Sequence, residues 1–149
     1  MLARQTGTVP KEMSHAEMFD RFVNGRLGLK EWTHEAHLIT TWVALRDRTP
    51  AETLAFLRHA IQTHNCGIGI TNDDASGYHE TLTVYYVTAV HQAAAPSPEA
   101  LYDIATCGRK AALEFWSRDV LFSVEARRRW VEPNLGPLPW TPEFDTAPV

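Results

Sequence analysis

TPAETLAFLRHAIQTHN, residues 49–65, carries the clearest helix signal in the chain. Thr49 stands at the position of a helix cap, Pro50 follows at the first helical position, and Glu52 completes the spacing of a capping box. Leucine or isoleucine then recurs at positions 54, 57 and 61, which places apolar side chains on one helix face. The segment therefore predicts a helix that ends near Asn65.

Similar signals predict helices on both sides of this segment. A capping box at Ser14 opens a helix that ends at Gly25, and Thr33 can cap a second helix that runs to about Arg48. Residues 66–77 are rich in glycine, asparagine and aspartate and predict a loop of functional length. Further helices are expected over residues 78–95, 97–108 and 109–130, and the last of these can break near 117–123.

The stretch TLTVYYV at residues 81–87 is the exception, since its composition favours a strand. The length of the periodic stretch favours a helix instead. The chain is therefore predicted to be a single all-α domain, a bundle of five or six helices over residues 14–132, preceded by a flexible arm at residues 1–13. Residues 133–149 hold five of the nine prolines and predict an extended Pro-rich C-terminal tail. Three apolar residues should pack this tail on the bundle: Leu135, Leu138 and Trp140.

Composition excludes several classes of function. The 149 residues suit one domain, and the net charge of −4 with no basic face argues against nucleic-acid binding. Cys66 and Cys107 form no CxxC pair and lie in different predicted elements, so we expect free thiols and a reducing, cytoplasmic location. No run approaches the ~18 apolar residues of a membrane span, and the N-terminus lacks the apolar core of a signal peptide. We therefore expect no membrane partner.

Three histidines lie near the starts of two predicted helices. His34 and His37 are separated by about 60° on a helix that turns ~100° per residue, so both rings can converge on one point. His79 shares a helix face with Leu82 and Tyr86, the face expected to lie inward. Two imidazoles from one helix and a third from a facing helix suit a catalytic divalent metal ion with an open coordination position. The sequence therefore predicts three metal ligands: His34, His37 and His79.

A metal ion at this site could polarise a carbonyl group or activate a water molecule of a small organic substrate. Tyr78 and Glu80 are then the candidate catalytic residues for proton transfer. Glu80 points about 100° away from His79 on the helix, so it is not expected to bind the same ion. Three cations could meet an anionic substrate: Arg109, Lys110 and Arg118.

Other interpretations fit the same residues. Glu31-x-x-His34 has the spacing of a di-iron carboxylate site, but it straddles a predicted helix cap, and a cysteine nucleophile has no local signature here. A histidine in a first helical turn can also simply hydrogen-bond backbone or water. The main alternative function is a metal-free helical protein that binds a small molecule through the same histidines and tyrosines. A structural helical protein that binds a partner is the third.

Several motifs stand out along the chain: Trp32-Thr33-His34-Glu35-Ala36-His37-Leu38, Gly77-Tyr78-His79-Glu80-Thr81, Leu121-Phe122-Ser123 with Ala126-Arg127, Glu132-Pro133-Asn134-Leu135 and Pro137-Leu138-Pro139. They resemble the motifs of a bacterial family of small uncharacterised helical proteins. The resemblance covers about residues 22–139, and it implies a shared site at the histidines but no reaction. Val124 stands where proline is expected and Asn134 where aspartate is expected.

Overall fold

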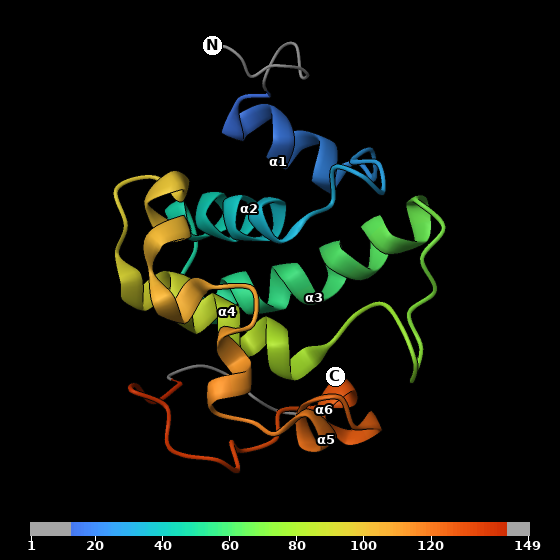
Figure 1. The fold of residues 1–149 in the computed structure, drawn as a ribbon. Coiled ribbons are helices and arrows are strands. Elements are labelled where there is room, and N and C mark those ends of the chain that lie inside the picture. Colours follow the sequence, from blue (N-terminus) through green and yellow to red (C-terminus); the bar gives the residue numbers. More distant parts are fainter. Residues whose placement is uncertain (1–12, 143–149) are drawn as a thin grey trace.

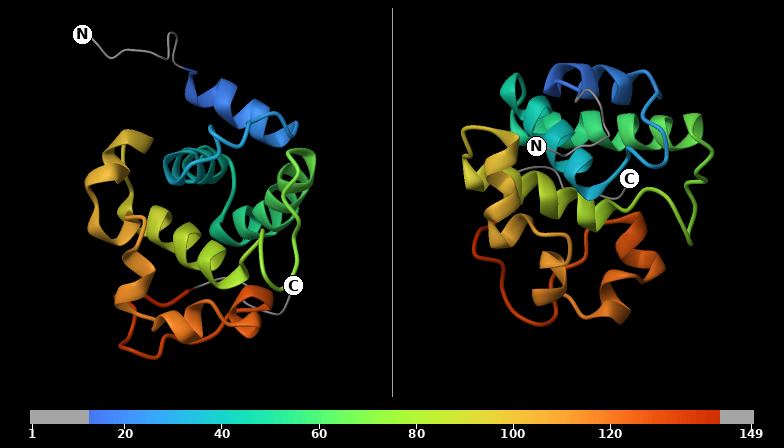
Figure 2. Two further views of the ribbon diagram at one scale, coloured as in Figure 1. Left: turned by 45° about the vertical axis from the view of Figure 1, so that its right-hand side comes forward. Right: turned by 45° about the horizontal axis from the view of Figure 1, so that its top comes forward.

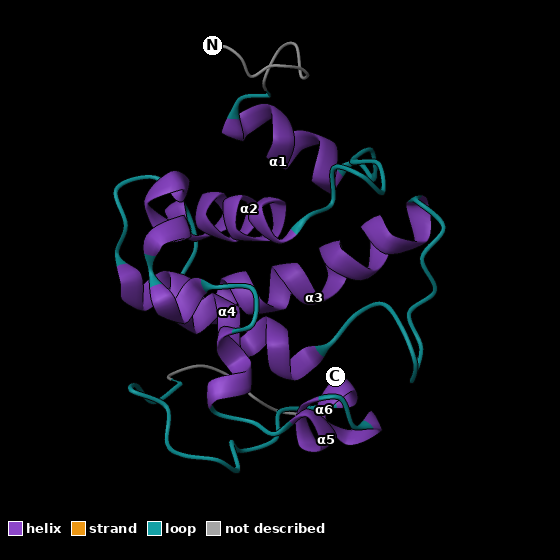
Figure 3. Cartoon of the chain, viewed as in Figure 1, coloured by secondary structure: helices purple, strands orange, loops and turns teal. Residues whose placement is uncertain are grey.

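The computed structural model describes residues 13–142, which form six α-helices, three short 3₁₀ helices and no strand (Figure 1, Figure 3). The predicted all-α class is therefore confirmed. Residues 1–12 of the expected arm and residues 143–149 of the expected tail lie outside the described residues. In chain order the helices are α1 (His15–Val23), α2 (His34–Arg46), α3 (Pro50–Gly67), α4 (Glu80–Ala93), the 3₁₀ helices η2 (Pro98–Asp103), η3 (Ala105–Cys107) and η4 (Ala111–Glu114), then α5 (Arg118–Leu121) and α6 (Val124–Arg128).

The first three helices begin at the predicted caps. The hydroxyl oxygens of Ser14 and Thr33 each accept a hydrogen bond from the backbone N–H three residues further on. At α3 the capping box is complete, because Glu52 N donates to Thr49 Oγ1 at 3.1 Å and Thr49 N donates to Glu52 Oε1 at 2.9 Å. Helix α3 continues to Gly67, two residues beyond the predicted end.

Helix α4 is the central element of the fold. Figure 1 shows it between α1 and α2 at one end of the molecule and α5 and α6 at the other. The β-prone stretch at residues 81–87 is helical, and most of α4 is buried on more than one face. Burial by neighbouring elements therefore overrides the local strand preference. The helix begins at Glu80, with His79 as its cap, slightly later than the sequence predicts.

The helices predicted over residues 97–108 and 109–130 are wrong in detail. The first range forms the 3₁₀ helices η2 and η3, and the second is divided into η4, α5 and α6. Ser117 and Ser123 explain the breaks, because both have extended backbones and their hydroxyl oxygens cap α5 and α6. Figure 2 shows how this C-terminal part, in gold to orange, turns back along α2 and α4.

The described part of the tail packs on the bundle, but not through all the predicted residues. Leu138 and Trp140 contact the core, and the Trp140 ring lies 5.9 Å from that of Tyr85. The prediction for Leu135 is wrong, because this residue is 58% exposed. Its backbone N–H donates to Phe115 O instead, so the main chain rather than the side chain holds the tail at this point.

Two hydrophobic clusters form the core. One surrounds Trp116 and Tyr85 in the C-terminal half, and the other surrounds Phe22 and Leu57 from α1 and α3. Helix α4 contributes residues to both clusters, so it joins the two halves of the molecule. Both cysteines are free thiols, as predicted. Between residues 13 and 142 no helix has the length and apolar character needed to cross a bilayer.

Candidate functional site

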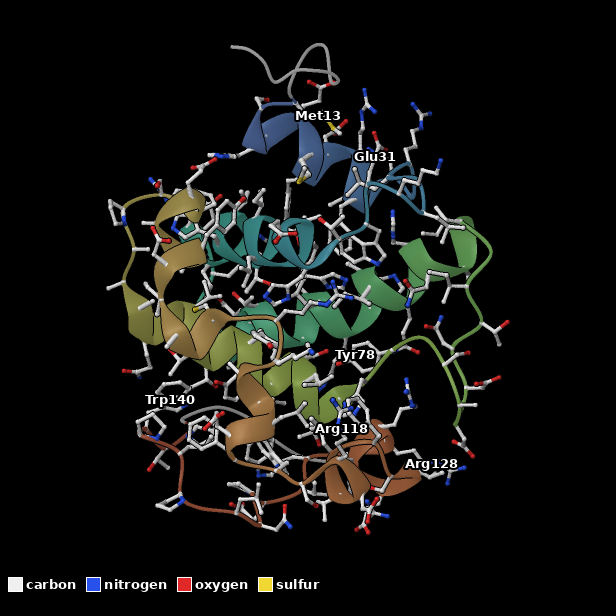
Figure 4. All side chains as sticks on the ribbon, in the orientation of Figure 1. Met13, Glu31, Tyr78, Arg118, Arg128 and Trp140 are labelled. Carbon is white, nitrogen blue, oxygen red and sulfur yellow. The ribbon has the colours of Figure 1, made fainter. Side chains whose placement is uncertain are left out.

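A cavity of about 670 Å³ lies between α2, α3, α4 and the segment from η3 to α5. Its lining includes members of both core clusters, for example Leu57 from one and Leu121 from the other. Figure 4 labels Tyr78 and Arg118, which line the cavity from the loop before α4 and from the start of α5. The three histidines predicted as metal ligands also line it: His34, His37 and His79.

His79 caps α4 and is nearly buried in the cavity wall. Its Nδ1 atom accepts a hydrogen bond from Leu82 N at 3.1 Å, and its Nε2 atom lies 2.7 Å from Leu121 O. Because a carbonyl oxygen only accepts, Nε2 carries the hydrogen and the ring is neutral. Burial lowers the pKa of His79 to about 4, against the opposing effect of the hydrogen bond to Leu121. Both ring nitrogens are therefore engaged by the backbone.

His34 is held in a similar way at the opposite wall. Its Nε2 atom lies 2.8 Å from Cys107 O and donates to it. Its ring meets the ring of Tyr86 edge-on at 5.2 Å, and the Tyr86 hydroxyl donates to Gly108 O at 2.6 Å. These two side chains therefore fix the backbone of residues 107–108 against α2 and α4.

His37 is the least constrained of the three histidines. Its ring stacks on Trp32 with 3.7 Å between ring centroids, and it has no ring hydrogen bond to any part of the chain that the structure describes. Burial lowers the pKa of His37 to about 3, and the neighbouring His34 and His64 lower it further. His37 is therefore a neutral imidazole that a ligand in the cavity can reach.

Two of the three histidines use ring nitrogens to bind the backbone. Both nitrogens of His79 and one nitrogen of His34 hold backbone groups on different segments. Within residues 13–142, no group of three or more histidine, cysteine, aspartate or glutamate side chains is arranged to hold a metal ion. Metal binding by His34, His37 and His79 stays a prediction for solution measurement.

The two candidate catalytic residues lie in contact with each other, but only one lines the cavity. Tyr78 lines it, and its hydroxyl donates to Glu80 Oε1 at 2.6 Å. Glu80 is fully buried, and its carboxylate also binds Arg58, whose Nη2 lies 2.6 Å from Oε2. Burial raises the pKa of Tyr78, and the charge and hydrogen bond of Glu80 raise it further. Proton transfer by either residue stays a prediction.

Sequence reasoning missed Arg58, the partner that neutralises Glu80. A signal was available, because Arg58 lies one helical turn from both Leu54 and Ile61 and so interrupts their apolar stripe. A cation in such a stripe indicates a buried carboxylate on the facing element. Asn72 was missed for a different reason, since its role depends on loop geometry.

Asn72 fixes the loop that forms one wall of the cavity. Its Oδ1 atom accepts from Asn65 Nδ2 at 2.9 Å and from Tyr78 N at 3.0 Å. Arg127 holds the other side of the loop by donating from Nη1 to Gly77 O at 3.0 Å. The predicted loop of functional length is therefore tied to both α3 and α6.

The arrangement offers a ligand three kinds of contact: an apolar and aromatic wall, the neutral imidazole of His37, and cations at the mouth. The cations are the three that the sequence singled out, Arg109, Lys110 and Arg118, and all of them line the cavity.

Comparison with protein-family models, with curated proteins and with solved structures gives no match.

Proposed function

We propose that the protein binds a small organic molecule in this cavity and that the histidines act there without a metal ion. The observation that carries the proposal is the use of the ring nitrogens. His34 and His79 donate to carbonyl groups of Cys107 and Leu121, which leaves His37 as the imidazole free to meet a ligand. The histidines then shape the cavity and do not share an ion.

The size and lining of the cavity support this function. Ligand pockets commonly measure roughly 300–1,000 Å³ and combine apolar walls with a few placed polar groups. This cavity has about 670 Å³, with apolar residues such as Leu57 and Leu82 beside His37 and Tyr78. A drug-sized or smaller molecule would fit against the aromatic ring of Trp32 and reach the imidazole stacked on it.

A variant in which a larger side chain fills the cavity tests the proposed function. Leu82→Trp enlarges a half-buried lining residue of α4, whereas Gln92→Trp places the same side chain at an exposed position of the same helix. Compounds from a small-molecule screen that bind the cavity should raise the melting temperature of the wild type and of Gln92→Trp, but not of Leu82→Trp. Compounds that stabilise Leu82→Trp as strongly as the wild type would contradict the proposal.

The metal-dependent enzyme is the competing function. Metal analysis of freshly purified, untagged protein separates the two, because the proposed function predicts less than stoichiometric metal after preparation in metal-replete buffer without chelators. One bound ion per chain that is lost in His34→Ala, His37→Ala and His79→Ala alike would overturn the metal-free cavity.

A further inference from the structure

Three cations line the cavity. Arg109, Lys110 and Arg118 are exposed, so they lie at its mouth, and none belongs to an ion pair among residues 13–142. In contrast, Arg128, which is also exposed, is paired with Asp74. Like charges around one cavity repel one another, and a bound anion relieves this repulsion.

The remainder of the lining does not cancel this positive charge. No aspartate or glutamate in the described part of the chain lines the cavity, although the whole chain has 18 acidic residues against 14 lysines and arginines. Glu80, which lies just behind Tyr78, is neutralised by Arg58. Arg127 adds to the positive potential, since its charge contributes to the lowered pKa of His79. The cavity is therefore cationic in an acidic chain.

Arg109 and Lys110 follow directly after a backbone segment that two side chains of the cavity wall fix by hydrogen bonds. His34 donates to Cys107 O and Tyr86 donates to Gly108 O, immediately before Arg109 and Lys110. The backbone that carries these side chains is therefore fixed before a ligand arrives. A pre-ordered site binds an anion with a smaller entropic cost than a mobile loop would.

The third cation is positioned from the other side. Arg118 is the first residue of α5, a single turn that ends at Leu121. The carbonyl of Leu121 accepts the hydrogen bond from Nε2 of the His79 ring. The two histidines with engaged nitrogens thus each hold a segment that supplies positive charge.

The interior of the cavity has the opposite character. Leu57 and Ile61 of α3, with Trp32 beside them, present apolar and aromatic surface to the space. Inorganic ions would leave this surface uncovered, whereas a molecule with an apolar body and one charged end would cover it.

We propose that the ligand of this cavity is a small organic anion, an inference that rests on the proposed function. Its carboxylate or phosphate group lies between Arg109, Lys110 and Arg118 at the mouth, and its apolar body lies against Trp32, Leu57 and Ile61. Arginine and lysine both recognise carboxylates and phosphates. The experiment therefore compares a ligand that carries a carboxylate with one that carries a phosphate.

The test compares three probes that share one ring system: naphthoate, naphthyl phosphate and the neutral naphthalenemethanol. Calorimetry measures their binding to the full chain at low and high ionic strength. The double variant Lys110→Gln/Arg118→Gln removes two cations of the mouth. Lys30→Gln/Arg26→Gln is its matched control, because these residues are exposed and do not line the cavity.

One anionic probe should bind the wild type about tenfold or more tightly than the alcohol, and added salt should weaken only the anion. The preference should fall to near unity in Lys110→Gln/Arg118→Gln and persist in Lys30→Gln/Arg26→Gln. Equal binding of alcohol and anions to the wild type would overturn the anion inference and leave the proposed function intact. An anion preference that persists in Lys110→Gln/Arg118→Gln would also overturn the anion inference and leave the proposed function intact. Failure of all three probes to bind would count against both.

Discussion

His79 combines two structural roles in one side chain. Its Nδ1 atom caps α4 by accepting from Leu82 N, a role usually taken by serine, threonine, aspartate or asparagine. Its Nε2 atom reaches Leu121 O, 42 residues away in the sequence. The residue therefore couples the start of the central helix to α5.

This coupling predicts a graded response to substitution. His79→Ala should lower the free energy of unfolding by about 2–3 kcal/mol, because it removes a helix cap and leaves the Leu121 carbonyl without its donor. His79→Asn restores a cap acceptor and should recover about 1 kcal/mol of this loss. His91→Ala, an exposed change on the same helix, is the control and should have almost no effect in urea unfolding. Equal losses for His79→Ala and His91→Ala would contradict the role of His79.

The neutral state of the buried histidines predicts a dependence of stability on pH. The pKa values of His79 and His37 lie at about 4 and about 3 in the fold, below the value of 6.5 for a free histidine. The unfolded chain therefore binds more protons below pH 6.5, so the free energy of unfolding should decrease as the pH falls through this range.

The slope is at most about 1.4 kcal/mol per pH unit for each histidine. Urea unfolding between about pH 7 and about pH 5 measures it, and His79→Asn should show a smaller slope than the wild type because one titrating group is gone. A stability that does not change over this interval, or an unchanged slope in His79→Asn, would show that these histidines are not held neutral by the fold.

At the scale of elements, the loop between α3 and α4 depends on a close approach at Gly77. The φ angle of Gly77 is +82°, and a Cβ atom there would lie 2.6 Å from Asn72 Oδ1 and also meet Thr71 O. Asn72 Oδ1 is the atom that accepts from Asn65 and Tyr78. A side chain at position 77 therefore disturbs the wall of the cavity as well as the backbone.

Gly69 provides a matched comparison, since its φ angle is +87° and its Cβ position is open. Gly69→Ala should cost about 1 kcal/mol for the backbone conformation alone. Gly77→Ala should cost clearly more and speed amide exchange in residues 68–79, because Asn72 must move. The comparison uses urea unfolding and hydrogen exchange, and similar results for the two variants would exclude the close approach.

The elements that the sequence predicted correctly are those with local signals. The caps at Ser14, Thr33 and Thr49 act within one helical turn, so they can be recognised from residue spacing alone. The division of residues 109–130 depends on tertiary contacts as well, such as the Ser117 N–H donating to Asn134 Oδ1. Likewise, the side chain of Leu135 is exposed, and a backbone bond to Phe115, which no side-chain pattern reveals, holds this part of the tail.

The same distinction applies to the candidate site. Helical spacing places His34 and His37 on α2 one turn apart, whereas His79 lies outside the helix as the cap of α4, and all three line the same cavity. The directions of the His34 and His79 ring nitrogens depend on carbonyl groups at residues 107 and 121, which lie far away in the sequence. The spacing of the histidines in the sequence therefore fits a metal site and a set of histidines that hydrogen-bond the backbone equally well.

At the scale of the whole molecule, the cavity lies where the two core clusters meet. Its walls come from α3 of one half and from the segment between η3 and α5 of the other, with α2 and α4 shared. A ligand in this position contacts both halves, so its binding should raise the unfolding temperature of the whole chain in one transition. The cavity also unites an apolar interior with a cationic mouth in a chain of net charge −4.

His34 and His79 thus anchor the backbone of the proposed ligand cavity, His37 stays free for a ligand, and in the proposed function the three histidines do not share a metal ion. Long-range proton–nitrogen NMR spectra of the histidine rings, recorded with and without one equivalent of zinc, distinguish these roles from a shared metal site. We expect a neutral Nε2–H tautomer for His79 and a hydrogen on Nε2 of His34 at neutral pH, both unchanged by zinc. Saturable changes in the ring nitrogens of His34, His37 and His79 together, complete at one equivalent of zinc, would contradict the proposed function.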